Sequence, residues 1–134
     1  MDIAGQANQI MQTLLPGHLG IKIETATREE VVGSMTVTEM LCTTGGILHG
    51  GAMMALADTL GALVAFLNLP SGARTSTVES KTNFLRPAAT GTKVTACCKI
   101  ANKGRTLILL VTELRDDRDR LLAMTSQSQI IIRE

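Results

Sequence analysis

The sequence predicts an α+β domain in which a curled antiparallel sheet of about six strands is wrapped around one long apolar helix. Three observations point to this fold. A run of mostly apolar residues follows His49-Gly50-Gly51 and continues to Leu69, with the length and composition of a helix. Segments on both sides of that run alternate apolar and polar residues, as half-buried strands do. The last four of these segments have no helix between them, so they must pair antiparallel through short turns. Residues 1–134 are expected to form one domain.

The N-terminal third predicts one amphipathic helix and two strands. Residues 3–15 carry apolar side chains at helical spacing, and Pro16-Gly17 is expected to end this helix. Residues 21–24 and 31–38 alternate in polarity and are predicted as strands with a turn between them. Residues 39–48 follow as a loop that leads into the long helix.

The helix predicted over residues 50–68 is the centre of the expected fold. It is apolar on every side apart from one carboxylate, Asp58, and a helix that is apolar all round is a buried helix. Asn68, Pro70 and Gly72 are expected to end it. The run is nearly long enough to cross a membrane, but Asp58, Asn68 and the flanking glycines argue against a span. The strands that follow provide a sheet to bury it instead.

The second half of the chain is dominated by strand patterns. Strands are predicted over residues 75–85, 93–100, 105–115 and 121–132. In the first of these strands, Val78 and Phe84 are expected on one face, opposite the polar residues Glu79, Lys81 and Asn83. Short connections are predicted over residues 87–91, 102–104 and 116–119.

Composition argues against several classes of function. The formal net charge is +1 with both signs scattered, so neither nucleic acid nor a membrane is an expected partner. Aromatic residues make up 1% of the chain, so base-stacking platforms are absent. Three cysteines, two of them adjacent, match neither a disulfide framework nor the spacing of a zinc site. No metal or cofactor is expected, and a reducing cytoplasm is the predicted location.

The central segment offers two chemical tools. The backbone N–H groups at the start of the helix, where Gly50 and Gly51 have no side-chain bulk, suit a developing negative charge. The carboxylate of Asp58 in an apolar setting suits a general base or a nucleophile. The two positions are eight residues apart, which is about 12 Å along one helix. Reacting groups must approach to about 3.5 Å, so a site that uses both residues takes them from different chains. This predicts a two-fold dimer with shared active sites.

Three motifs occur together in the chain. They are the apolar helix opened by His49-Gly50-Gly51, Asp58 nine residues after the histidine, and the strand ending in Asn83-Phe84-Leu85-Arg86-Pro87. Together they resemble the hotdog-fold acyl-CoA thioesterases, above all the phenylacetate-pathway, 4-hydroxybenzoyl-CoA and 1,4-dihydroxy-2-naphthoyl-CoA types. A later Gly104-Arg105 turn also matches, and the likeness spans about residues 16–133. The resemblance implies a hotdog fold, dimers that pair their sheets edge to edge, further assembly into tetramers, and active sites across the dimer interface.

The resemblance also implies roles for individual residues. The Gly50 N–H would polarise the thioester carbonyl, and Asp58 of the other chain would act as base or nucleophile. His49 would orient the loop or the substrate carbonyl, and Thr77 is the candidate for holding the attacking water. The residues implied to contact the substrate, with the coenzyme A phosphates and adenine at the arginine-proline turn and the hairpin, are Gly51, Leu85, Arg86, Pro87, Lys103, Gly104 and Arg105.

One position departs from the family pattern. Many members carry Asn or Gln six residues before the histidine, where this chain has Thr43, a shorter side chain with one donor. Thr43 is therefore a candidate site residue that bears on the rate or the substrate subgroup. Plainer interpretations stay open for the other candidates: a structural carboxylate for Asp58, close packing for the glycines, and an ordinary strand hydroxyl for Thr77.

The predicted activity is hydrolysis of an acyl-CoA to a free acid and coenzyme A. Two alternatives stay open. One is an acyl-CoA-binding module without catalysis. The other is an acyl-thioester dehydratase or hydratase, which usually needs a differently placed pair of histidine and acidic residues. The expected partners are a small-molecule acyl-CoA and further copies of the chain, in a homotetramer.

Overall fold

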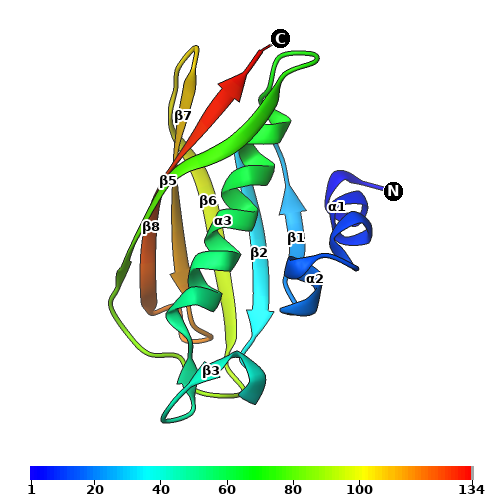
Figure 1. The fold of residues 1–134 in the computed structure, drawn as a ribbon. Coiled ribbons are helices and arrows are strands. Elements are labelled where there is room, and N and C mark those ends of the chain that lie inside the picture. The colour runs from blue at the N-terminus through cyan, green and yellow to red at the C-terminus, as the bar shows by residue number, and fades with distance from the viewer. Residues whose placement is uncertain (134) are drawn as a thin grey trace.

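The computed structural model describes residues 1–133 and contains one six-stranded antiparallel sheet with a long helix against one face (Figure 1). The helices are α1 (Ile3–Met11), α2 (Leu15–His18) and α3 (Gly50–Leu67). The strands of the large sheet are β1 (Lys22–Ala26), β2 (Glu30–Thr36), β5 (Arg74–Phe84), β6 (Lys93–Lys103), β7 (Leu107–Arg115) and β8 (Leu121–Ile132). A 3-10 turn (Glu39–Leu41) and the short hairpin β3 (Cys42–Thr43) and β4 (Ile47–Leu48) precede α3.

The strand order explains how the sheet encloses the helix. The strands lie in the order β1-β2-β6-β7-β8-β5, and every neighbouring pair is antiparallel. The sheet curls around α3, which contacts β2, β5, β6, β7 and β8 (Figure 1). The predicted α+β fold, with six antiparallel strands and one central helix, is confirmed. Strands β1 and β5 are the two edges.

Helix α3 is buried on one side only. Its buried residues are Ala52, Met53, Leu56, Ala57, Leu60, Gly61, Val64 and Ala65. On the other side Met54 is half-buried, and Phe66 keeps 64% of its surface exposed. Asp58 is also exposed. The prediction of a helix buried all round is therefore wrong for a single chain, because the sheet covers one face. By length and composition α3 could cross a membrane, but its inner face is the core of the domain.

The predicted N-terminal helix over residues 3–15 is broken into two pieces. Asp2 caps α1 by accepting a hydrogen bond from the Gly5 N–H at 2.8 Å. The helix ends at Met11, and Pro16 lies in the first turn of α2, where its missing N–H costs nothing. Pro16-Gly17 therefore lies inside a second helix instead of ending the first.

Strand β5 contains a bulge that puts two residues predicted on one face onto opposite faces. The register with β8 shifts between Thr77 and Glu79, so Val78 is left out of the ladder and is 56% exposed. Phe84 is also 52% exposed. The prediction that Val78 and Phe84 share one face is wrong, because the bulge displaces the alternation by one residue. Val78 lies on the outer face, whereas Phe84 is in phase with Ser80 and Thr82 on the helix side, where its ring lies over Gly50. The better covered side chains of β5 are hydroxyls: Thr75, Thr77, Ser80 and Thr82.

Candidate active site

The N-terminus of α3 is closed by the side chain of His49. Its Nδ1 accepts a hydrogen bond from the Gly51 N–H at 2.7 Å, which caps the helix. Because Nδ1 is the acceptor, the proton of the neutral imidazole lies on Nε2. A Cβ at position 51 would lie 2.9 Å from Nδ1, so glycine is what lets the ring fold back over the helix.

The cap leaves one amide available at this helix end. Among residues 1–133 the Gly50 N–H has no acceptor, whereas the Gly51 N–H is used by His49. The Phe84 ring covers Gly50, and two of its atoms would lie 3.1 Å from a Cβ at this position. Gly50 therefore presents a free donor at the positive end of the helix. Gly51, expected to contact the substrate, has its N–H already occupied.

A groove of about 360 Å³ opens beside Gly50. It brings together five of the residues singled out in the sequence: Thr43, Gly50, Leu85, Arg86 and Pro87. Thr43 reaches the groove from β3, and the others come from the helix start and the turn after β5. Four lining residues were not predicted as site residues: Ile47, Leu48, Met53 and Phe84. Phe84 belongs to the Asn-Phe-Leu-Arg-Pro motif, and this position could have identified it as a site residue from the sequence. The groove has an apolar lining with Arg86 as its cation.

Asp58 lies in the middle of α3 and is held from the sheet. Its Oδ1 accepts hydrogen bonds from Thr77 Oγ1 at 2.7 Å and from Gln127 Nε2 at 2.8 Å. Thr77, the candidate for holding the attacking water, is thus hydrogen-bonded to Asp58 of the same chain. Gln127 was missed, together with Gln129, and both glutamines are 1% exposed. Both lie in a run of polar residues, Thr125 to Gln129, so no alternation of polarity marked them as inward-facing.

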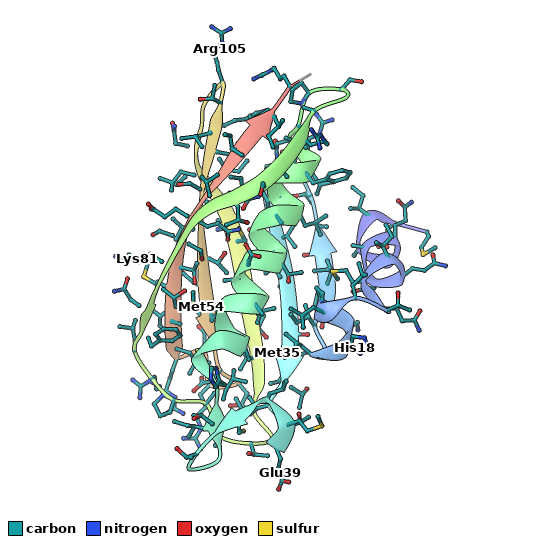
Figure 2. The ribbon with its side chains drawn as sticks, in the orientation of Figure 1. His18, Met35, Glu39, Met54, Lys81 and Arg105 are labelled. Atoms are coloured by element: carbon teal, nitrogen blue, oxygen red, sulfur yellow. The ribbon has the colours of Figure 1, made fainter. Side chains whose placement is uncertain are left out.

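The remaining predicted contacts lie far from the groove. Arg86 follows the end of β5 that pairs with Ala123, whereas Lys103 lies at the opposite end of the sheet, where Leu107 pairs with Ile130. Figure 2 shows Arg105 at the tip of that far hairpin. Lys103 and Gly104 line a separate pocket of about 280 Å³ near the C-terminus of α3. One chain does not bring the two groups of implied coenzyme A contacts together.

Comparisons with known proteins assign the family. The family model described as "Thioesterase superfamily" matches residues 45–123, which include the start of α3 and Asp58. The chain belongs to the thioesterase superfamily. A Haemophilus influenzae relative named "Putative esterase" is 30% identical to this thioesterase over 125 residues, covering 93% of this chain and 90% of the relative. A Saccharolobus solfataricus protein that is also named as a putative esterase is 31% identical over 132 residues, covering 98% of this chain and 89% of that protein.

Solved structures support the same assignment. A thioesterase from Haemophilus influenzae superposes with a TM-score of 0.92 at 29% identity, covering 98% of this chain and 92% of that one. The PaaI protein of the phenylacetic acid degradation operon of E. coli superposes with a TM-score of 0.85 at 23% identity, covering 98% and 97%, which shows a shared fold. The predicted hotdog fold is confirmed, and the thioesterase is a thioester hydrolase.

Proposed function

We propose that this thioesterase hydrolyses acyl-CoA, with Gly50 of one chain and Asp58 of a second chain in each active site. The observation that carries the proposal is the free Gly50 N–H, which opens α3 beside a groove with an apolar lining. Asp58, hydrogen-bonded by Thr77, lies on the same helix but about 12 Å away. One chain alone therefore cannot bring both groups to one carbonyl.

The proposed reaction needs only water and these side chains. The carbonyl oxygen accepts a hydrogen bond from the Gly50 N–H, and the helix dipole stabilises the negative charge that develops there. Asp58 takes a proton from water as the water oxygen bonds to the carbonyl carbon. The carbon–sulfur bond then breaks, and the sulfur takes the proton from Asp58. Thr77 donates to Asp58 and can accept from the water, which places it to orient the nucleophile.

The groove supports an apolar acyl group attached to an anionic carrier. Its lining is apolar at Leu48, Met53 and Phe84, and its cation is Arg86. An arginine suits the phosphates of coenzyme A. Lys103 and Arg105 would reach the same coenzyme A from the second chain. A cytoplasmic location, indicated by the three free cysteines, is part of the proposal.

The second chain is proposed to dock along β5. This edge strand is 11 residues long and has no neighbour on its outer side within the described chain. Val78 on this strand and Phe66 on the outer face of α3 are exposed. Antiparallel pairing of two β5 strands would cover this surface and set the two α3 helices side by side. Pairs of such dimers would form the homotetramer that the resemblance implies.

Release of free thiol from a panel of aryl-, medium-chain and short-chain acyl-CoAs tests the activity. The wild type should turn over at least one class, and Asp58→Asn should lower kcat at least about 100-fold. Asp117→Asn, an exposed carboxylate in the β7–β8 turn, is the matched control and should keep full activity. Signal from the protein's own three cysteines must be subtracted. Tight coenzyme A binding with no turnover on any substrate would instead indicate a binding module.

A further inference from the structure

A buried polar network continues inward from Asp58. Gln127 Nε2 donates to Asp58 Oδ1 at 2.8 Å and to Gln129 Oε1 at 2.7 Å. Gln129 Nε2 donates to Thr75 Oγ1 at 3.2 Å. Thr77 Oγ1 lies within hydrogen-bond distance of both Asp58 Oδ1 and Gln129 Oε1. The exposed carboxylate is thus connected to two amides in the core.

The network contains fewer protons than its contacts need. Two oxygen–oxygen contacts meet at Thr77, one with Asp58 and one with Gln129, and each needs a proton between its two oxygens. Thr77 has one hydroxyl proton. The two N–H groups of Gln127 already point at Asp58 and Gln129. When Asp58 is ionised, one of the contacts at Thr77 therefore lacks a proton.

Flipping the glutamine amides, so that oxygen and nitrogen exchange places, does not supply the missing proton. If the oxygen and nitrogen of one glutamine amide alone are exchanged, the contact between Gln127 and Gln129 joins two oxygens or two nitrogens. If both are reversed, Gln129 donates to Thr77 and to Gln127, but Gln127 then presents its oxygen to Asp58. That contact now needs the proton. In each self-consistent arrangement, the network is complete only when Asp58 carries a proton.

The packing around Gln127 indicates that stability alone does not explain this amide. Its Oε1 is buried and has no hydrogen-bond partner among residues 1–133. A Cβ at Gly61 would lie 2.3 Å from this oxygen, so a glycine in α3 makes room for the amide. A buried acceptor without a partner is destabilising, and an apolar side chain of the same shape would avoid that cost.

We propose that Gln127 and Gln129 are positioning residues that prepare Asp58 to accept a proton during hydrolysis. The inference rests on the proposed function, in which Asp58 takes that proton from the attacking water. The proton is held on Oδ1, between Asp58 and Thr77, while Thr77 turns its own proton to Gln129. When the proton passes on to the departing sulfur, the network returns to its original state, so the network favours proton uptake at the step where the water must lose one.

Kinetics of Gln127→Met and Gln129→Met test the role of the amides. Each variant should lower kcat about 10–100-fold, because a hydrogen bond to or within a charged network is lost, while KM changes little. Thr125→Val is the matched control, since it removes a partly buried 2.7 Å contact with Thr82 between the same two strands without touching Asp58. It should keep the wild-type kcat. In an Asp58→Asn background, Gln127→Met should leave the residual rate unchanged, because it acts through Asp58.

Thermal denaturation tests the proton deficit without using activity. Asp58→Asn brings its own N–H groups into the network and should raise Tm. A lower Tm for Asp58→Asn would contradict the deficit. If the wild type hydrolyses acyl-CoA and both methionine variants keep kcat, the positioning role is overturned while the proposed function stands. If no acyl-CoA is hydrolysed, the proposed function fails, and a raised Tm for Asp58→Asn would still support the network.

Discussion

At the scale of single residues, each residue of the His49-Gly50-Gly51 motif has a different role at the start of α3. His49 caps the helix, Gly51 gives its N–H to that cap, and the Gly50 N–H stays free. A side chain at position 51 would meet the His49 ring that forms the cap, and one at position 50 would press against the Phe84 ring. The motif therefore leaves one amide free, which is the donor that the proposed function assigns to the substrate oxygen.

The cap makes His49 a residue whose structural role can be measured. His49→Ala removes the acceptor for the Gly51 N–H and should cost about 1 kcal/mol of stability, or about 3–5 °C in Tm. His49→Asn keeps a side-chain acceptor and should retain most of the Tm. Differential scanning calorimetry of both variants checks this. An unchanged Tm for His49→Ala would refute the capping role, and a large loss of kcat in His49→Asn at full Tm would reveal direct contact with the substrate.

At the scale of elements, what the sequence predicts well is what depends on local periodicity. The apolar run predicted α3 to within one residue, and alternation located all six strands of the large sheet. The bulge at Val78 and the polar inner face of β5 were not predictable in this way. They depend on the partner strand β8, whose hydroxyl and amide side chains meet those of β5. The contacts between two strands far apart in the sequence leave no local pattern.

The residues of the candidate site likewise fall into two groups, those in contiguous motifs and those that only the fold brings together. The residues around Gly50 and Arg86 belong to contiguous motifs, so the resemblance identified them before their geometry was known. Gln127 and Gln129 lie in the run Thr-Ser-Gln-Ser-Gln, where polar residues occupy both faces of the strand. Alternation of polarity is then absent, and nothing local indicates which side chains point inward. Their proximity to Asp58 comes from the fold alone.

The turn between β7 and β8 gives a prediction about stability and pH. Asp116 is 7% exposed, and its burial alone would raise its pKa. Hydrogen bonds from the backbone of Arg120 and Arg118, and from the Arg120 guanidinium, outweigh that effect and lower the pKa. A lowered pKa in the folded state means that the carboxylate stabilises the fold above its unfolded pKa of about 3.9. This contribution is lost as pH falls through the lower, folded pKa.

Replacing this carboxylate should therefore matter most near neutral pH. Asp116→Asn should lower Tm at pH 7, and the difference from wild type should shrink as the pH is taken below about 4. Melting curves across this pH range check the prediction. Asp117→Asn in the same turn is the control, because Asp117 is exposed, and it should leave Tm unchanged. A difference in Tm for Asp116→Asn that stays constant down to pH 3 would contradict the assignment.

At the scale of the whole molecule, three features of the single chain would each be completed by a second chain. Helix α3 is covered on one face, edge strand β5 has no outer neighbour within residues 1–133, and Arg86 lies at the opposite end of the sheet from Arg105. A second chain related by a two-fold axis along β5 would cover the helix and complete the sheet. The sheet of the second chain would run in the opposite direction. Its β6–β7 hairpin, which carries Arg105, would therefore lie toward the Arg86 end of the first chain.

Mixed dimers test this arrangement directly. Gly50→Ala brings a Cβ against the Phe84 ring, and Asp58→Asn removes the proposed base, so each variant alone should be nearly inactive. If each site takes Gly50 from one chain and Asp58 from the other, a dimer of the two variants contains one site with both defects and one intact site. Differently tagged, co-expressed and co-purified mixed dimers should therefore recover about half of the wild-type kcat per dimer. Each homodimer, purified in the same way, is the control. Mixed dimers as inactive as both homodimers would mean that Gly50 and Asp58 act within one chain, and the shared site would have to be abandoned.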